Sequence, residues 1–122
     1  MEPSRPLVVK TTAGVERLEA CAQAFTVAAT AVAAGARVSL WLTGEASWLA
    51  VPGRAAEVEL QHSTPLDQLL DVVLTAGTVT VCTQCAARRG LVEADLVPGV
   101  RIAGAASFVE ESLAPGAQAL VY

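Results

Sequence analysis

Five short apolar runs, rich in Val, Leu and Ile, recur along the chain and are bounded by Gly, Pro or Thr. Runs of this length and composition are typical of β-strands. The clearest are 7–11, which reads Leu-Val-Val-Lys-Thr, and 78–81, which reads Thr-Val-Thr-Val. The pattern therefore predicts strands at 7–11, 36–42, 78–81, 100–103 and 117–121.

Longer segments between these runs repeat their apolar residues at helical spacing. A helix is predicted from about Val15 to Ala34, where Gly35 ends it. A second helix is predicted with Thr64 as its N-cap and Pro65 at its first helical position. Its apolar face is formed by Leu66, Leu69, Leu70, Val73 and Leu74. Shorter helical pieces are expected at 45–49, directly after the third strand, and at 105–113.

Strands and helices alternate along the whole chain. Such alternation is typical of βαβ units, in which parallel strands are joined by right-handed crossovers. We therefore predict an α/β three-layer domain with an about five-stranded, mostly parallel sheet of flavodoxin- or Rossmann-like topology. The length of 122 residues fits a single domain over 1–122.

The first long helix carries two kinds of apolar face. Larger side chains dominate one face, which consists of Val15, Leu18, Ala22, Phe25, Ala29 and Val32. Alanines form the other face, at positions 20, 24, 28 and 31. The first face is expected to lie on the sheet. The alanine face packs either against a neighbouring helix of the same chain or against another subunit, and in the second case Ala24→Glu should dissociate the oligomer.

Composition and charge narrow the classes of protein. Hydrophobic residues make up 53% of the chain but aromatic ones only 4%, so the core consists of small side chains that each bury little area. We therefore expect partner subunits to complete the burial in a homo-oligomer. The net charge of −4 argues against nucleic acid as a partner, because nucleic-acid binding depends on a basic surface.

Three features bear on the compartment. The chain runs from Met1 almost directly into a strand-like segment, without the pattern of a secretory signal. The uncharged stretch from Ala20 to Ala36 is rich in alanine and interrupted by Gln and Thr, so it fits a buried helix better than a membrane span. Three cysteines in such a chain do not predict a disulfide scaffold. A cytoplasmic protein without membrane contact is expected.

Two of the three cysteines stand where the third predicted strand gives way to a helix. Cys82 ends the strand, and Cys85 falls in the first helical turn, followed by Arg88 and Arg89. A helix N-terminus carries partial positive charge, and together with nearby arginines it favours the thiolate, the reactive form of cysteine. The arginines can equally serve to stabilise the helix C-terminus. We take Cys82 and Cys85 as candidate catalytic residues, and Cys21 as core filler inside the long helix.

The Cys-x-x-Cys spacing is compatible with further roles. Both cysteines are small enough to be buried structural residues. A thioredoxin-like dithiol has the same local order, although here the motif follows the third strand and no aromatic residue precedes it. A zinc site needs four ligands, and the single histidine, His62, lies in a polar loop, so no metal is expected. The turn 12–14 lacks the spacing of a nucleotide-binding fingerprint, so no cofactor is expected either.

The other strand ends offer polar and aromatic candidates. Ligands of open parallel sheets bind outside the carboxyl ends of the strands. Threonines at these ends can donate hydrogen bonds to a ligand, although turn formation explains them equally well. Trp41 and Trp48 either wall a pocket beside the cysteines or fill the core. The candidate binding residues are Thr11, Thr12, Thr43, Arg88 and Arg89.

The segment 79–82, with Ala-Ala-Arg-Arg-Gly at 86–90, resembles the signature of the DsrE/TusD-like sulfur-relay family. The order of predicted elements resembles that family over nearly the whole chain. By this resemblance Cys82 matches the cysteine that accepts sulfane sulfur as a persulfide and passes it on. The resemblance also implies a homotrimer or homohexamer, with sulfur donor and acceptor proteins or small thiols as partners. The chain departs from the family pattern by carrying Cys85 as well.

Three functions remain open from the sequence. The leading hypothesis is a sulfur carrier or sulfurtransferase that holds sulfane sulfur as a persulfide on Cys82. The first alternative is a thiol–disulfide redox protein that uses Cys82 and Cys85. The second is a non-catalytic small-ligand or regulatory binding module in which both cysteines are inert.

Overall fold

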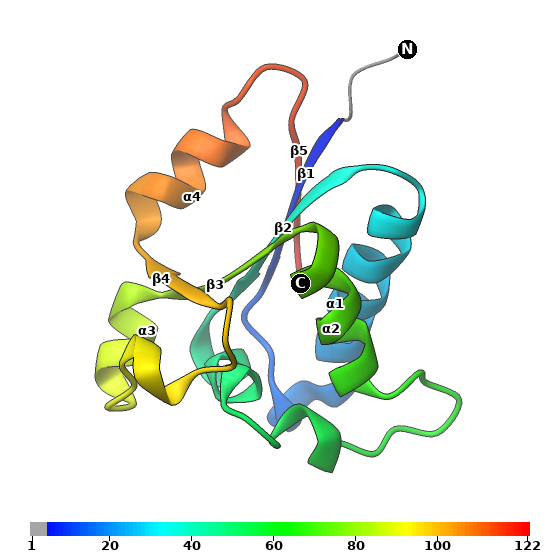
Figure 1. Cartoon of the computed structure of the whole chain (residues 1–122), viewed down its shortest axis with the longest axis vertical. Helices are drawn as coiled ribbons and strands as arrows, with labels where there is room; N and C mark the ends of the chain where they lie inside the picture. Colours follow the sequence, from blue (N-terminus) through cyan, green and yellow to red (C-terminus); the bar gives the residue numbers. More distant parts are fainter. Residues whose placement is uncertain (1–4) are drawn as a thin grey trace.

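A computed structural model, which describes residues 5–122, shows five parallel strands in the order β4-β3-β2-β1-β5 (Figure 1). The predicted α/β class is confirmed, and each predicted strand is found within about a residue or two of its expected bounds. The strands are β1 (Pro6–Thr11), β2 (Arg37–Leu42), β3 (Thr78–Cys82), β4 (Arg101–Ala103) and β5 (Gln118–Val121). The start of the chain, on which the expected lack of a secretory signal rests, lies outside the described residues in positions 1–4.

Four α-helices and four short 3-10 helices connect the strands. The 3-10 helix η2 (Gly44–Ala50) occupies the position of the helical piece expected at 45–49. Within residues 5–122, no helix is both long enough and apolar enough to cross a membrane. The α-helices are α1 (Leu18–Ala33), α2 (Leu66–Ala76), α3 (Thr83–Arg88) and α4 (Ala105–Ser112), and the other 3-10 helices are η1 (Val15–Arg17), η3 (Ala55–Glu57) and η4 (Glu93–Asp95).

Two helix starts differ from the prediction. The first long helix opens with the 3-10 turn η1, and α1 proper begins only at Leu18, because Arg17 has the non-helical backbone angles φ −140° and ψ 69°. The predicted N-cap Thr64 is wrong. Pro65 is extended, with φ −52° and ψ 134°, and therefore takes the N-cap position itself, so that α2 begins one residue later.

The helices cover the two faces of the sheet unequally. Helices α1 and α2 lie on one face, and α4 lies on the other (Figure 1). The main core lies under α1 and α2, where apolar strand residues such as Leu40 and Val81 meet the helices. The connection from β3 to β4 contributes Ala86, Leu96 and Val100 to this same core. The connection from β4 to β5, which is α4, leaves to the opposite face, so β3 and β4 form the topological switch point of the sheet.

Helix α1 buries a single broad face rather than two separate ones. Ala24 and Ala28 are fully buried together with Phe25, in the angle between the sheet and α2. The alanine face thus packs within the chain, and Ala24→Glu would place a charge in the core. Val15, which was expected on the sheet face, is 65% exposed because it precedes α1 in the separate turn η1. Cys21 is fully buried, as expected for core filler.

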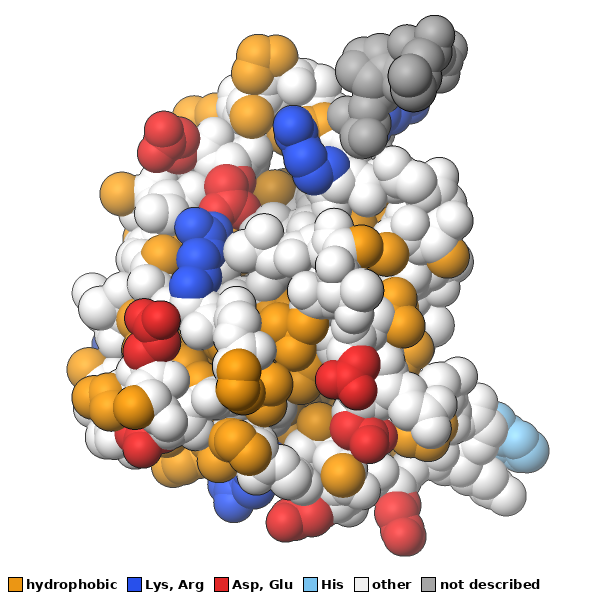
Figure 2. All heavy atoms as spheres, viewed as in Figure 1, with side chains coloured by type: hydrophobic (Ala, Val, Ile, Leu, Met, Phe, Trp, Pro, Cys, Tyr) orange, Lys and Arg blue, Asp and Glu red, His pale blue; other side chains and the backbone are white. Residues whose placement is uncertain are grey.

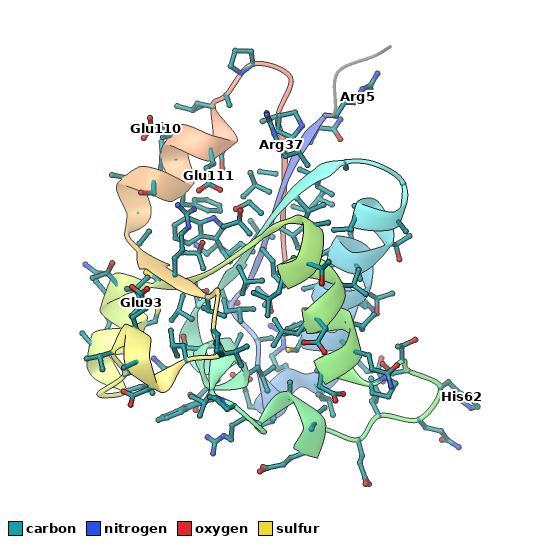
Figure 3. The ribbon with its side chains drawn as sticks, viewed as in Figure 1. Arg5, Arg37, His62, Glu93, Glu110 and Glu111 are labelled. Carbon is teal, nitrogen blue, oxygen red and sulfur yellow. The ribbon has the colours of Figure 1, made fainter. Side chains whose placement is uncertain are left out.

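Polar contacts hold α4 to its face of the sheet. No residue of α4 is fully buried, but the Glu111 carboxylate accepts hydrogen bonds from Ser39 Oγ and Trp41 Nε1 and pairs with Arg101 (Figure 3). The ring of Phe108 meets Trp41 edge to face, with centroids 5.5 Å apart. Trp41 is therefore a core residue beneath α4.

Apolar side chains remain at the surface on the α4 and β5 side of the molecule. Figure 2 shows several of them along α4. All four residues of the edge strand β5 are exposed, and Leu113, just beyond α4, is 78% exposed. This side of the sheet is covered far less completely than the side under α1 and α2.

Candidate functional site

The switch point places Cys82 between the starts of two helices. Cys82 is the last residue of β3, where it pairs with Ala103 of β4, and it is also the N-cap of α3. On the neighbouring strand, Gly104 is the N-cap of α4. A Cβ added to Gly104 would lie 3.7 Å from Thr83 Oγ1, so the two loops adjoin. In open α/β sheets, ligands bind outside the carboxyl ends of the strands at such a switch point.

The two cysteines of the motif have different surroundings. Cys82 is partly exposed, whereas Cys85, the third residue of α3, is only 9% exposed. The Sγ of Cys85 accepts a hydrogen bond from the backbone N–H of Gly44, at a donor–acceptor distance of 3.2 Å. Side chains alternate along a strand, so Cys82 lies on the same side of β3 as Thr80, whose Oγ1 accepts a hydrogen bond from Arg101. Cys82 therefore opens toward the α4 side, and Cys85 toward the end of β2.

Arg89 ties α3 to the loop after β2. Its Nη1 donates to the backbone carbonyl of Cys85 at 3.1 Å, while Nε and Nη2 donate to Glu45 Oε2 at 3.2 and 3.1 Å. The same carboxylate oxygen accepts a hydrogen bond from Trp48 Nε1. The guanidinium of Arg89 is thus directed at Glu45 and at the backbone, and it fixes the helical turn that carries Cys85. Arg88 is exposed.

The candidate threonines are engaged in the loops that carry them. Thr11 Oγ1 donates to the carbonyl of Ala13, and Thr43 Oγ1 donates to the carbonyl of Thr11, both at 2.9 Å. Thr12 Oγ1 donates to the carbonyl of Tyr122 at 3.2 Å. Thr43 directly follows β2, which is next to β3, while Thr11 ends β1, one strand further away, and Thr12 follows it. Only the Thr11 hydrogen bond is the local turn contact that the sequence left open, whereas Thr43 and Thr12 tie the ends of neighbouring strands together.

Glycines allow the strand-end loops to pack tightly beside Cys85. Gly44 has a φ of +55°, and a Cβ there would lie 2.7 Å from the carbonyl oxygen of Thr12. A Cβ on Gly14 would lie 2.6 Å from the carbonyl oxygen of Glu45. Sequence reasoning did not identify Gly44 as a site residue, because Gly44 contributes through its backbone N–H and has no side chain. The only signal was a glycine in the two-residue turn that closes the predicted strand 36–42.

Cys21 and His62 lie apart from this site. Burial, together with the charge of Glu16, raises the pKa of the Cys21 thiol to about 12, so it stays protonated and unreactive at neutral pH. His62 sits on the exposed loop before α2 and points away from the molecule (Figure 3). In the described part of the chain, no group of three or more His, Cys, Asp or Glu side chains is arranged to hold a metal ion.

An open cavity of about 420 Å³ lies on the far side of Glu45. Trp48 lines it, and the guanidinium of Arg54 lies 5.0 Å from the centre of the indole ring. Glu57 and Glu59 add negative charge to its wall, and neither Cys82 nor Cys85 belongs to its lining. Trp48 therefore borders a pocket, but not one that the cysteines share.

The fold and this edge define an α/β protein with a cysteine-bearing helix at the switch point of a parallel sheet. The model of the DsrE/DsrF-like family matches residues 7–118, and the chain belongs to this family. The predicted resemblance is thereby confirmed at the level of the family.

Solved structures show the same fold. The YchN protein from E. coli superposes with a TM-score of 0.79 at 17% sequence identity, over 98% of this chain and 100% of that one. MTH1491 from Methanobacterium thermoautotrophicum, described as a protein of unknown function, gives a TM-score of 0.69 at 10% identity with the same coverage. No curated protein sequence matches the chain. At these identities the likeness concerns the fold alone.

Proposed function

We propose that the chain is a sulfur carrier or sulfurtransferase in which Cys82 accepts sulfane sulfur, holds it as a persulfide and passes it on. The observation that carries this proposal is the position of a partly exposed Cys82 at the switch point, between the starts of α3 and α4. Membership of the DsrE/DsrF-like family supports it, because the resemblance of the segment 79–90 assigns the relay cysteine to this position.

The proposed cycle consists of two sulfur transfers. In the first, the Cys82 thiolate attacks the sulfane sulfur of a donor, and the donor's S–S bond breaks with its electron pair leaving on the donor thiolate. In the second, an acceptor thiolate attacks the outer sulfur of the Cys82 persulfide, and Cys82 leaves as a thiolate. The attacking thiolate and the persulfide anion both carry negative charge, which the partial positive charge at a helix N-terminus stabilises.

Partners follow from the same proposal. We infer a homotrimer or homohexamer, supported by the exposed apolar residues of β5 and of the end of α4. Sulfur donor and acceptor proteins or small thiols would approach the open side of Cys82. The proposed place of action is the cytoplasm.

The proposal is tested by loading with inorganic polysulfide, removing the excess by desalting and measuring the intact mass. We expect the wild-type chain to gain the mass of added sulfur, or to show the mass of a product that the loaded form has since given. The mass of Cys82→Ser should stay unchanged. Cys21→Ala is the matched control, because Cys21 is buried in α1, and it should react like wild type. Equal sulfur gain by Cys82→Ser and wild type would show that the carrier is another residue.

A thiol–disulfide redox protein is the second candidate, favoured by the placement of the two cysteines at the N-cap and third position of α3. It requires both cysteines and an oxidant, and it predicts no stable persulfide in Cys85→Ser. Iodoacetamide separates both chemical hypotheses from an inert binding module. If neither Cys82 nor Cys85 is alkylated in the folded protein at neutral pH, the binding module remains, with the cavity beside Trp48 as its place.

A further inference from the structure

Cys85 is a second thiol at the carrier site, and a one-cysteine relay has no use for it. Its sulfur is not packed into the main core as that of Cys21 is. The Gly44 N–H donates to Cys85 Sγ at 3.2 Å, which holds this sulfur at the carboxyl edge of the sheet. An N–H donor stabilises negative charge on sulfur, and the thiolate is the attacking form in thiol exchange.

The backbone brings the two cysteines within disulfide range. Cys82 is the N-cap of α3 and Cys85 is its third residue. Helix geometry separates Cα atoms three residues apart by about 5 Å, inside the range of roughly 4.4–6.8 Å that disulfides span. The Cys82 side chain makes no capping hydrogen bond, so its sulfur is not held by the start of α3. Cys82 opens toward the α4 side and Cys85 toward Gly44, so a bond between them requires their side chains to turn toward each other over one helical turn.

The turn that carries Cys85 is fixed from outside. Arg89 donates to the Cys85 carbonyl and is paired with Glu45, the residue after Gly44. The same loop therefore holds both the sulfur of Cys85, through Gly44, and its backbone, through Glu45 and Arg89. Such clamping lowers the entropic cost of an attack by Cys85 on its neighbour.

We propose, building on the persulfide function of Cys82, that Cys85 is a resolving thiol that discharges the stored sulfur as hydrosulfide. The Cys85 thiolate attacks the inner sulfur of the Cys82 persulfide, and the bond between the inner and outer sulfur atoms breaks. The outer sulfur leaves with the electron pair as HS⁻, and a Cys82–Cys85 disulfide forms. The sulfane sulfur is reduced by two electrons and the two cysteines are oxidised by two, so no outside oxidant takes part. A dithiol reductant then reopens the site.

This activity limits how long sulfur stays on the protein. A persulfide that meets an acceptor is passed on, and one that does not is released as sulfide. The disulfide then keeps Cys82 from reloading until it is reduced. The site would thus couple sulfur release to the supply of dithiol reductant.

The test follows fully reduced wild type, Cys85→Ser and Cys21→Ala without oxygen, after a short pulse of inorganic polysulfide and rapid desalting. Released sulfide, free thiols and intact mass are measured over time. Serine is chosen because its hydroxyl can still accept the hydrogen bond from Gly44. Wild type and Cys21→Ala should release sulfide and form the Cys82–Cys85 disulfide. Cys85→Ser should keep its persulfide longer by at least about tenfold, because an intramolecular attack has been removed.

The outcomes separate this inference from the proposed function. If Cys85→Ser does not take up sulfur at Cys82, the carrier function itself fails. If Cys85→Ser loads but wild type keeps its persulfide equally long, the carrier stands and the resolving role of Cys85 is wrong. If the wild-type disulfide forms only when an oxidant is added and not after loading with sulfur, the resolving role is also overturned. That result would favour a thiol–disulfide redox function of Cys82 and Cys85.

Discussion

At the scale of single residues, three cysteines of one chain have three different environments. Cys21 is enclosed in the main core, Cys82 is partly exposed at the switch point, and Cys85 is buried against the N–H of Gly44. Burial near Glu16 makes Cys21 a poor nucleophile. The two candidate reactive cysteines are therefore the ones at the strand end and in the first turn of α3, and not the one enclosed in α1.

Gly44 is the residue whose substitution tests the packing of the strand-end loops. We expect Gly44→Ala to destabilise the fold, because a Cβ would press on the Thr12 carbonyl at 2.7 Å and the φ of +55° disfavours alanine. Gly53→Ala is the matched control: its φ is +86° but its Cβ would meet open space, so it should cost only about 1 kcal/mol. Urea unfolding measures both. Equal losses would mean that the contact with Thr12 does not constrain the loop.

The sequence predicted the residues of the site better than their contacts. The thiol positions at 82 and 85 follow from the strand run and the helix after it, which are local patterns. The hydrogen bond from Gly44 to Cys85 joins positions 41 residues apart, and the pair of Arg89 with Glu45 joins positions 44 apart. Contacts of that separation depend on the strand order, which local periodicity does not define. From the sequence, Arg89 was a candidate for stabilising either the thiolate or the helix C-terminus, and its contact with Glu45 was not foreseen.

At the scale of elements, α3 and α4 differ in what holds them. The start of α3 is tied to the loop after β2 through Cys85 and Arg89. Helix α4 is anchored chiefly at one polar residue, Glu111, with Phe108 packing on Trp41. The start of α4 adjoins Thr83, the residue after Cys82, so the anchoring of α4 bears on the surroundings of the site.

Glu111 is predicted to stabilise α4 in a pH-dependent manner. Burial alone would raise its pKa, but hydrogen bonds from Ser39, Trp41 and Arg101 and the Arg101 charge outweigh burial, so the pKa is lowered. Its contribution is therefore fully present above the unfolded-state pKa of about 4.3 and is lost as the pH falls through the lowered folded-state pKa.

The measurement compares Glu111→Gln with Glu110→Gln, which alters the exposed neighbour on the same helix (Figure 3). At neutral pH we expect Glu111→Gln to lower the free energy of unfolding more than Glu110→Gln does. The difference between wild type and Glu111→Gln should shrink in urea unfolding carried out below about pH 4. A difference that stays constant with pH would show that the Glu111 charge does not anchor α4.

Element types were predictable because each carries its own local signal. The strands are β-branched runs, and α1 is long and ends at Gly35, which has a φ of +90°. The start of α2 was missed because Thr64 and Pro65 both fit the N-cap region, and only the extended backbone of Pro65 decides between them. The network around Glu111 could not be foreseen, since it joins α4 to Ser39 and Trp41, about 70 residues away.

At the scale of the whole molecule, the two faces of the sheet are unequal. One is covered by α1 and α2, while the other, within residues 5–122, has α4 above it and the exposed strand β5 at its edge. The small side chains of the chain predicted incomplete burial, and exposed apolar residues such as Val109, Leu113 and Val121 lie along α4, just beyond it and on β5.

A homo-oligomer that covers this side should depend on Val121. We expect Val121→Lys, on the exposed edge strand, to shift the chain toward monomer in sedimentation analysis. The lysine would place a charge in the proposed subunit interface, where burial of an unpaired charge is unfavourable. Val72→Lys, on the exposed face of α2, is the control and should leave the assembly unchanged. Dilution of wild type should also lower its melting temperature. A wild-type chain that is monomeric and melts at the same temperature at every concentration contradicts the oligomer.

The most direct test of the account is the location of sulfane sulfur on the loaded protein. Cys85→Ser is treated with inorganic polysulfide, desalted, capped with an alkylating agent and digested, and its peptides are measured by mass spectrometry. We expect one added sulfur atom on the peptide that carries Cys82 and none on the peptide that carries Cys21. Sulfur on Cys21, or no added sulfur on Cys82, would contradict the assignment of Cys82 as the sulfur carrier.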